Sequence, residues 1–313
     1  MKALITKTKI SSIMKGHFTF ALLLIFSSLS HTAIAEIANE DKVVTEKQCL
    51  DCHQLSSDNT VHAIWQTAHG NIAGKTSETC INCHGNSANH TNNPTKKSPT
   101  VSFGPRWKST AKVQNESCLT CHDKTQGMNW HGSIHQEEDM SCSSCHSSHK
   151  KSDPVLSKLT QPDACFSCHK RVKSQVHLKS RHPILEGKTA CSDCHNPHGT
   201  LSEYSLNEPS LNDSCYQCHS EKRGPVLFEH APVTEDCSTC HNTHGSVNDS
   251  LLTNRTPFLC QQCHSVAFHP SQQMDGSTLP GNKTSAYALG KNCLSCHSKV
   301  HGSNHPSGSR LTR

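Results

Sequence analysis

One five-residue pattern, Cys-x-x-Cys-His, occurs ten times in this chain of 313 residues and constrains its fold more than any other feature. The ten units contain all 20 cysteines and leave none over. In this spacing, two thiols add to the vinyl groups of one haem as thioethers, and the adjacent histidine reaches the iron. The sequence therefore predicts ten covalently bound c-type haems.

We number the units 1 to 10 in chain order. The predicted haem-attachment cysteines are, pair by pair, Cys49 and Cys52, Cys80 and Cys83, Cys118 and Cys121, Cys142 and Cys145, Cys165 and Cys168, Cys191 and Cys194, Cys215 and Cys218, Cys237 and Cys240, Cys260 and Cys263, and Cys293 and Cys296. The predicted iron ligand of each unit, here called the proximal histidine, follows the second cysteine: His53, His84, His122, His146, His169, His195, His219, His241, His264 and His297.

Two other uses of paired cysteines fit the pattern poorly. A disulfide framework gives no reason for a histidine after every second cysteine. Structural zinc sites use Cys-x-x-Cys knuckles without that invariant histidine. Haem attachment is therefore the interpretation that explains both residue types.

The chain is poor in the residues that build a protein core. Phe, Trp and Tyr make up 4% of the residues, and the mean hydropathy is −0.60. Such a chain cannot bury enough apolar surface to offset its conformational entropy unless haems supply the core. The expected fold class is a multihaem cytochrome c with little regular secondary structure, in which short α-helices and loops wrap around an elongated chain of ten haems.

The units form an internal repeat. From unit 3 to unit 9 the first cysteines follow one another at steps of 22 to 26 residues. In units 4, 6 and 8 a further histidine lies three residues after the proximal one: His149, His198 and His244. Ahead of the same units, 7 to 9 residues before the first cysteine, lie His135, His182 and His230. We therefore expect five two-haem modules, at about residues 49–117, 118–164, 165–214, 215–259 and 260–313.

These extra histidines predict a second ligand for every iron. Extending the pattern outward gives ten distal histidines: His69, His90, His135, His149, His182, His198, His230, His244, His269 and His301. We expect His198 to bind the iron of a neighbouring haem and not that of its own unit. His305 is an alternative to His301. The histidines that break the register, namely His62, His131 and His177, are expected to be ordinary surface side chains.

The N-terminus has the order of a secretory signal peptide. Four lysines precede an apolar run over residues 18–29, which is followed by Ala33-Ile34-Ala35. The run is shorter than the roughly 20 residues that span a bilayer. We therefore expect a signal peptide at residues 1–35 and a decahaem domain at residues 36–313. Removing four of the 30 basic residues leaves 26 against 25 acidic ones, so nucleic acid is not an expected partner.

Several stretches make the chain resemble the periplasmic decahaem c-type cytochromes of the MtrA/DmsE family. They are "CSDCHNPHG" (191–199), "EKRGPVLFEHAPVTEDC" (221–237), "CHNTHGSVND" (240–249), "LCQQCH" (259–264) and "VHGSNHPSG" (300–308). The resemblance implies distal ligation by His198, His230, His244 and His301. It also implies a periplasmic location, with outer-membrane association through a β-barrel partner.

The expected function is electron transfer. The resemblance implies that electrons pass from a periplasmic or inner-membrane cytochrome donor, through the barrel, to an extracellular multihaem cytochrome or terminal reductase in metal oxide or dimethyl sulfoxide respiration. Two histidines per iron leave no open coordination position, so we expect an electron carrier and not an enzyme. A soluble periplasmic shuttle or store is the alternative. A multihaem reductase fits less well, because it would need one haem with a vacant face.

Overall fold

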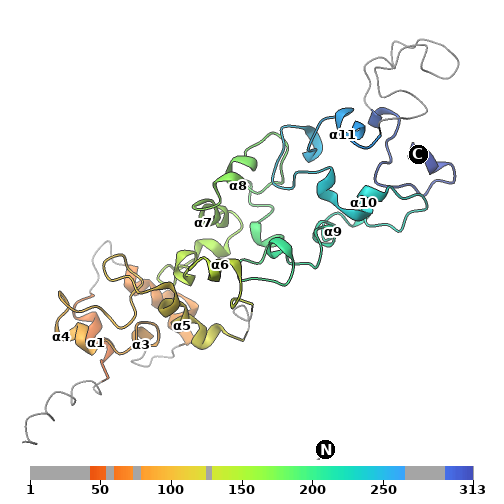
Figure 1. The fold of residues 1–313 in the computed structure, drawn as a ribbon. Helices are drawn as coiled ribbons and strands as arrows, with labels where there is room; N and C mark the ends of the chain where they lie inside the picture. Colours follow the sequence, from red (N-terminus) through yellow and green to blue (C-terminus); the bar gives the residue numbers. More distant parts are fainter. Residues whose placement is uncertain (1–42, 54–59, 73–78, 125–128, 265–292, 313) are drawn as a thin grey trace, which may run out of the picture. The chain divides into compact units, whose positions relative to one another are not determined.

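The computed structural model describes residues 43–53, 60–72, 79–124, 129–264 and 293–312. Within them the backbone forms no β-sheet, and four isolated bridges pair single residues. The expected signal peptide and His269 lie outside these residues. The fold class expected from the sequence is confirmed, since short helices and loops make up the described part of the chain (Figure 1).

Every helix in the described part is short. The α-helices are α1 (Glu46–Leu50), α2 (Ala68–Ile72), α3 (Thr79–His84), α4 (Ala88–Asn92), α5 (Ala111–His122), α6 (Ile134–Glu137), α7 (Gln161–Phe166), α8 (Lys170–Gln175), α9 (Leu211–Tyr216), α10 (Ala231–Glu235) and α11 (Phe258–Gln261). The 3₁₀ turns are η1 (Thr60–Gln66), η2 (Cys142–Ser144), η3 (Pro154–Leu156), η4 (Cys191–Asp193), η5 (Glu203–Ser205), η6 (Ser220–Lys222), η7 (Cys237–Thr239), η8 (Asp249–Leu251), η9 (Cys293–Ser295) and η10 (Gly308–Arg310).

Each Cys-x-x-Cys-His unit forms one helical turn. In eight units the backbone N–H of the proximal histidine donates to the carbonyl of the first cysteine, at 2.8 to 3.0 Å. In units 2 and 3 the same residues lie within α3 and α5. Residues i, i+3 and i+4 share one side of a helical turn. The two thiols and the imidazole therefore point to the same side of the backbone.

Buried amide side chains join an odd unit to the even unit after it. The Asn115 side chain in α5 accepts a hydrogen bond from the backbone N–H of Cys142 at 2.8 Å. Asn212 in α9 accepts one from Cys237 at the same distance. Each amide also donates to a backbone carbonyl near the even unit. Units 3 and 4, and likewise units 7 and 8, are thus held together through the first cysteine of the even unit.

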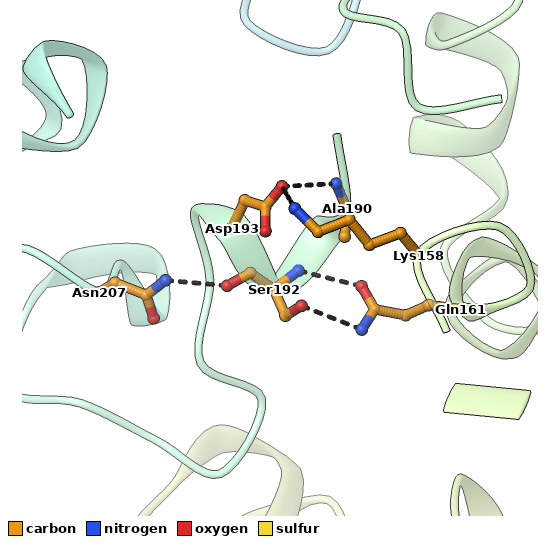
Figure 2. Close-up of polar contacts among 6 residues, drawn as sticks. All are labelled: Lys158, Gln161, Ala190, Ser192, Asp193 and Asn207. Atoms are coloured by element: carbon orange, nitrogen blue, oxygen red, sulfur yellow. Dashed lines mark hydrogen bonds and ion pairs between the residues drawn. The ribbon is translucent and has the colours of Figure 1, made fainter. Parts of the chain in front are cut away.

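Units 5 and 6 are joined by a related contact (Figure 2). Gln161 in α7 accepts from the backbone N–H of Ser192 and donates to its hydroxyl, both at 3.0 Å. Asn207 donates to the Ser192 carbonyl at 2.9 Å. Beside them, Lys158 forms an ion pair of 2.8 Å with Asp193. Polar side chains therefore connect these two units.

Apolar side chains contribute little to the interior. In the described residues, ten buried residues are polar and eight are hydrophobic, and the largest fully buried side chains are those of Gln114 and Val176. One apolar cluster consists of Phe166, Val176 and Ile184, with Val172 and Leu185 packed against it. This distribution agrees with the composition, which left the core to be supplied by another group. In the part of the chain that is described, none of the helices has the length and apolar character needed to cross a membrane.

Candidate haem-binding sites

The structure places nine expected distal histidines opposite nine proximal ones. The distances between ring centres are 6.5 Å for His53–His90, 6.0 Å for His69–His122, 6.3 Å for His84–His149, 6.2 Å for His135–His169, 5.9 Å for His146–His198, 6.4 Å for His182–His219, 6.1 Å for His195–His244, 6.2 Å for His230–His264 and 6.1 Å for His241–His301. The tenth expected distal histidine, His269, lies outside the described residues.

This spacing fits one iron between two imidazoles. An imidazole nitrogen binds a transition metal at about 2.0–2.1 Å, and the centre of a five-membered ring with bonds of about 1.35 Å lies about 1.15 Å from each ring atom. Two nitrogens on opposite sides of one metal therefore put the ring centres about 6.4 Å apart. The nine observed distances lie between 5.9 and 6.5 Å. The donor set thus fits a haem iron with two axial histidines.

Hydrogen bonds leave the correct ring nitrogen free in many of these side chains. In eight of the expected ligand histidines the Nδ1–H donates to a backbone carbonyl. They are His84, His90, His135, His149, His182, His195, His241 and His297. His230 donates in the same way to the carbonyl of Val300 at 2.9 Å. A bond at Nδ1 fixes the tautomer that presents the Nε2 lone pair to a metal.

Burial keeps several of these imidazoles neutral. Desolvation lowers the pKa of His69, His84, His198, His244 and His301, and the nearby histidines lower the pKa further. For His84 a backbone hydrogen bond to Val101 partly offsets the effect. Only the neutral ring has a lone pair for a metal, so the environment favours the form that ligates.

The pairing crosses the expected module boundaries. His198, in the module at residues 165–214, faces His146 of the preceding module. His182, in the same module, faces His219 of the following one. The neighbouring modules repeat this exchange, with one histidine directed back along the chain and one forward. The expectation that His198 serves a haem other than its own unit's therefore agrees with the position of its ring.

Adjacent pairs also contact one another through the backbone. The Nδ1 of His135 donates to the carbonyl of Pro197, the residue before His198, at 2.8 Å. His182 donates to the residue before His244, and His230 to the residue before His301, each at 2.9 Å. Each junction between units 4 and 5, 6 and 7, and 8 and 9 therefore has the same cross-link.

His301 and His305 differ in tautomer and in neighbour. The ring of His301 lies 6.1 Å from that of His241, with an angle of 13° between their planes. In His305 the Nδ1 accepts from the backbone N–H and the hydroxyl of Ser307, at 3.2 and 2.9 Å. An accepting Nδ1 places the proton on Nε2, which suits a surface hydrogen bond and not a metal. The geometry favours His301 as the ligand.

The thiols form a series in the order of the sequence. The first cysteines lie close enough to shift one another's pKa in pairs, between units 1 and 2, 3 and 4, 5 and 6, 7 and 8, and 9 and 10: Cys49–Cys80, Cys118–Cys142, Cys165–Cys191, Cys215–Cys237 and Cys260–Cys293. The second cysteines interact electrostatically at the alternate junctions: Cys83–Cys121, Cys145–Cys168, Cys194–Cys218 and Cys240–Cys263. Every unit therefore lies beside the next one in the chain.

Burial and these neighbours shift the thiol pKa values. Desolvation, together with the adjacent Cys49, raises the pKa of Cys80 to about 11. Desolvation and Cys237 raise the pKa of Cys215 to about 12. In the opposite direction, the hydrogen bond from Cys118 lowers the pKa of Cys142 to about 7. The largest effects thus lie where two attachment sites meet.

Three of the distal histidines, namely His198, His244 and His301, are each followed by a glycine in the left-handed backbone region. The φ angles are 101° at Gly199, 154° at Gly245 and 118° at Gly302. A Cβ on Gly199 would lie 2.5 Å from the carbonyl oxygen of Asn129, and one on Gly245 would overlap that of Gln175. At Gly199 and Gly245 only glycine permits this close approach of two backbones. A Cβ on Gly302 would instead meet the side chain of Val226.

Two features of the sites were missed by the sequence reasoning. Val101 and Lys97 lie outside every Cys-x-x-Cys-His unit, yet they supply the carbonyls that orient His84 and His90. Asp153 was not singled out, yet its carboxylate accepts from Nδ1 of His146 at 2.7 Å. No signal in the spacing of the units identifies either partner.

Within the described residues, no group of three or more His, Cys, Asp or Glu side chains is arranged to bind a metal ion.

Comparison with known proteins finds two families that match parts of this chain. The family described as a doubled CXXCH motif matches residues 182–224 and 230–268, and the family described as NrfB-like cytochrome c-type protein matches residues 80–161. The chain is therefore a multihaem c-type cytochrome, an electron-transfer protein with covalently bound haems.

Two relatives refine this class. The multiheme cytochrome MtrA of Shewanella baltica (strain OS185) is 46% identical over 271 residues, which cover 85% of this chain and 80% of that protein. The cytochrome c-type protein NrfB of Escherichia coli O6:H1 (strain CFT073) is 27% identical over 135 residues, covering 37% of this chain and 71% of that protein. The chain belongs to the MtrA family, as the resemblance in its motifs indicated.

Proposed function

We propose that this protein holds ten haems, each bound through one Cys-x-x-Cys-His unit and each ligated by two histidines. The nine ring pairs provide nine of the ten ligand sets, and His297 with His269 provides the tenth. The ring spacing and the Nδ1 hydrogen bonds support this assignment. With both axial positions taken, substrate has no access to an iron, so the protein acts as an electron carrier and not as an enzyme.

Electrons pass along the haems in the order of the sequence, from unit 1 to unit 10 or in reverse. The single observation that carries this step is the series of hydrogen bonds that joins each unit to its sequence neighbour from unit 2 to unit 9. Attachment sites in contact keep successive haems close. Loss of one internal haem would therefore interrupt the series.

The protein works in the periplasm and reaches across the outer membrane inside a β-barrel partner. A chain with this polar surface cannot face lipid, because unpaired polar groups in hydrocarbon cost several kcal/mol each. A closed barrel with a polar lumen removes that cost. A periplasmic or inner-membrane cytochrome supplies electrons, and an extracellular multihaem cytochrome or terminal reductase receives them.

Liposomes test this function. Vesicles that contain the cytochrome and its barrel, co-purified from outer membranes, should pass electrons from an external reductant to an enclosed acceptor. Vesicles with either component alone should not. A cytochrome that never associates with a barrel would contradict the conduit and leave the soluble shuttle or store as the function.

A variant of the cytochrome separates binding to the barrel from electron transfer along the haems. Replacing Cys142 and Cys145 by alanine removes the haem of unit 4, and transfer should fall strongly although the barrel still binds. His177→Ala is the matched control, because the His177 ring donates to the carbonyl of Lys173 and faces no proximal histidine. Unchanged transfer through the variant that lacks one internal haem would refute the sequential order.

A further inference from the structure

Four of the five even-numbered units orient the proximal histidine in the same way. In units 2, 6, 8 and 10 the Nδ1–H donates to a backbone carbonyl at 2.8 to 3.0 Å; the accepting residues are Val101, Tyr204, Ser250 and Arg310. In units 6 and 8 the accepting residue has φ of 56°, a backbone conformation that non-glycine residues rarely adopt. The backbone thus adopts an unfavourable conformation at these two residues and places a neutral acceptor beside the ring.

Unit 4 departs from this pattern. The Nδ1 of His146 donates to Oδ2 of Asp153 at 2.7 Å, and only 15% of the Asp153 side chain is exposed. Its second oxygen accepts from the backbone N–H of Val155 at 3.3 Å, at the start of η3. Within the described residues no lysine or arginine forms an ion pair with this carboxylate. Its negative charge therefore acts mainly on the imidazole.

We propose that Asp153 is a positioning residue that lowers the reduction potential of the haem at unit 4 relative to those of the other even units. The inference rests on the proposed ligation by His146. A carboxylate draws the Nδ1 proton more strongly than a carbonyl does and makes the ring a more electron-rich ligand. Such a ligand favours ferric over ferrous iron in the one-electron couple. The proton stays on the imidazole, and no bond is made or broken.

The position in the series gives this effect a consequence. Hydrogen bonds join unit 4 to unit 3 through Asn115 and Cys142, and to unit 5 through His135 and Pro197, so in the proposed sequential order electrons cross unit 4. A lower potential there makes its occupation by an electron unfavourable. Electrons then occupy units 2, 6, 8 and 10 in preference to unit 4.

A redox titration of the purified holoprotein with ten bound haems tests the proposal. Charge-assisted hydrogen bonds are about twice as strong as neutral ones. We expect Asp153→Asn to shift the ferric-to-ferrous ratio of one haem about tenfold toward ferrous at a fixed potential, a rise of about 59 mV for one electron. In the difference between the wild-type and variant titrations, about one tenth of the total amplitude should move upward.

Two further variants keep the result interpretable. Asp153→Glu retains the charge and should restore the wild-type titration. Asp153→Ser removes the charge but keeps a good N-cap for η3, and it should behave like Asp153→Asn. Mass spectrometry checks that all ten haems remain attached in each variant, so the measurement does not depend on the membrane partner or on conduction.

Asp193→Asn is the matched control. Asp193 lies within unit 6, and its carboxylate pairs with Lys158 at 2.8 Å (Figure 2), while the proximal His195 of that unit donates to the carbonyl of Tyr204. Its removal should leave the titration nearly unchanged. Titrations of both neutral Asp153 variants that superimpose on wild type would overturn the proposal. An equal displacement in Asp193→Asn would do so as well, because it would reduce the effect to a general field.

Discussion

Replacing His198 by alanine should change one haem in ten, and that haem should not be the one in its own unit. The ring of His198 lies parallel to that of His146, with an angle of 9° and a centre distance of 5.9 Å. Alanine removes the ring and leaves the iron of unit 4 with a single axial histidine. About one tenth of the total iron should therefore become high-spin, while all ten haems stay attached through their thioethers.

The surrounding loop should survive the substitution. The backbone N–H of His198 donates to the side chain of Asn196 at 3.0 Å, and the carbonyl of Pro197 accepts from His135 at 2.8 Å. Neither bond uses the imidazole that is removed. The change in spin state should consequently be confined to one site, and the haem of unit 5 should keep both ligands.

Electron paramagnetic resonance measures the high-spin fraction, and a second set of variants assigns it. In a background that lacks the haem of unit 4, through alanine at Cys142 and Cys145, the signal of His198→Ala should vanish. In a background that lacks the haem of unit 6, through alanine at Cys191 and Cys194, it should persist. A wholly low-spin spectrum, or the opposite dependence on background, would refute the pairing.

Two other expectations concern stability. Gly245→Ala forces a side chain into the left-handed region and against the Gln175 carbonyl, so thermal denaturation should show a loss of about 1–3 kcal/mol, whereas Gly104→Ala, which meets open space, should stay within about 0.5 kcal/mol of wild type. The hydrogen bond from Arg181 lowers the pKa of Glu186, so this pair stabilises the fold above the ordinary carboxyl pKa and loses its effect as pH falls through the lowered value. The melting-temperature gap between wild type and Glu186→Gln should close below about pH 4; a gap that widens in acid would contradict the sign.

The fold class followed directly from sequence, because ten identical units and few aromatic residues leave one kind of core. The histidines that could act as second ligands were also visible, since they recur at constant offsets from the units. Their partners were not visible. His69 faces His122 of the next module, while His90 faces His53 of its own. Spacing along the chain carries no information on such a choice, which depends on how the helical turns fold back.

Contacts through single atoms were also beyond the sequence. His301 and His305 are four residues apart and of the same type, and the hydrogen bonds at their Nδ1 atoms separate them. Asp153 stands in a polar stretch where a carboxylate is unremarkable until the His146 ring is placed beside it. The module boundaries and the role of His269 remain predictions.

The exchange of histidines between modules bears on the order in which the protein matures. In the proposed periplasmic location, export from the N-terminus would present His146 52 residues before His198, and His241 60 residues before His301. The even sites of units 2, 4, 6 and 8 must therefore wait for a later segment, while the odd sites from unit 3 onward find their partner already exported. The sites should therefore receive both ligands in order along the chain, with about two units incomplete at any time. A chain whose export stalls should hold incomplete sites only near its last exported residues.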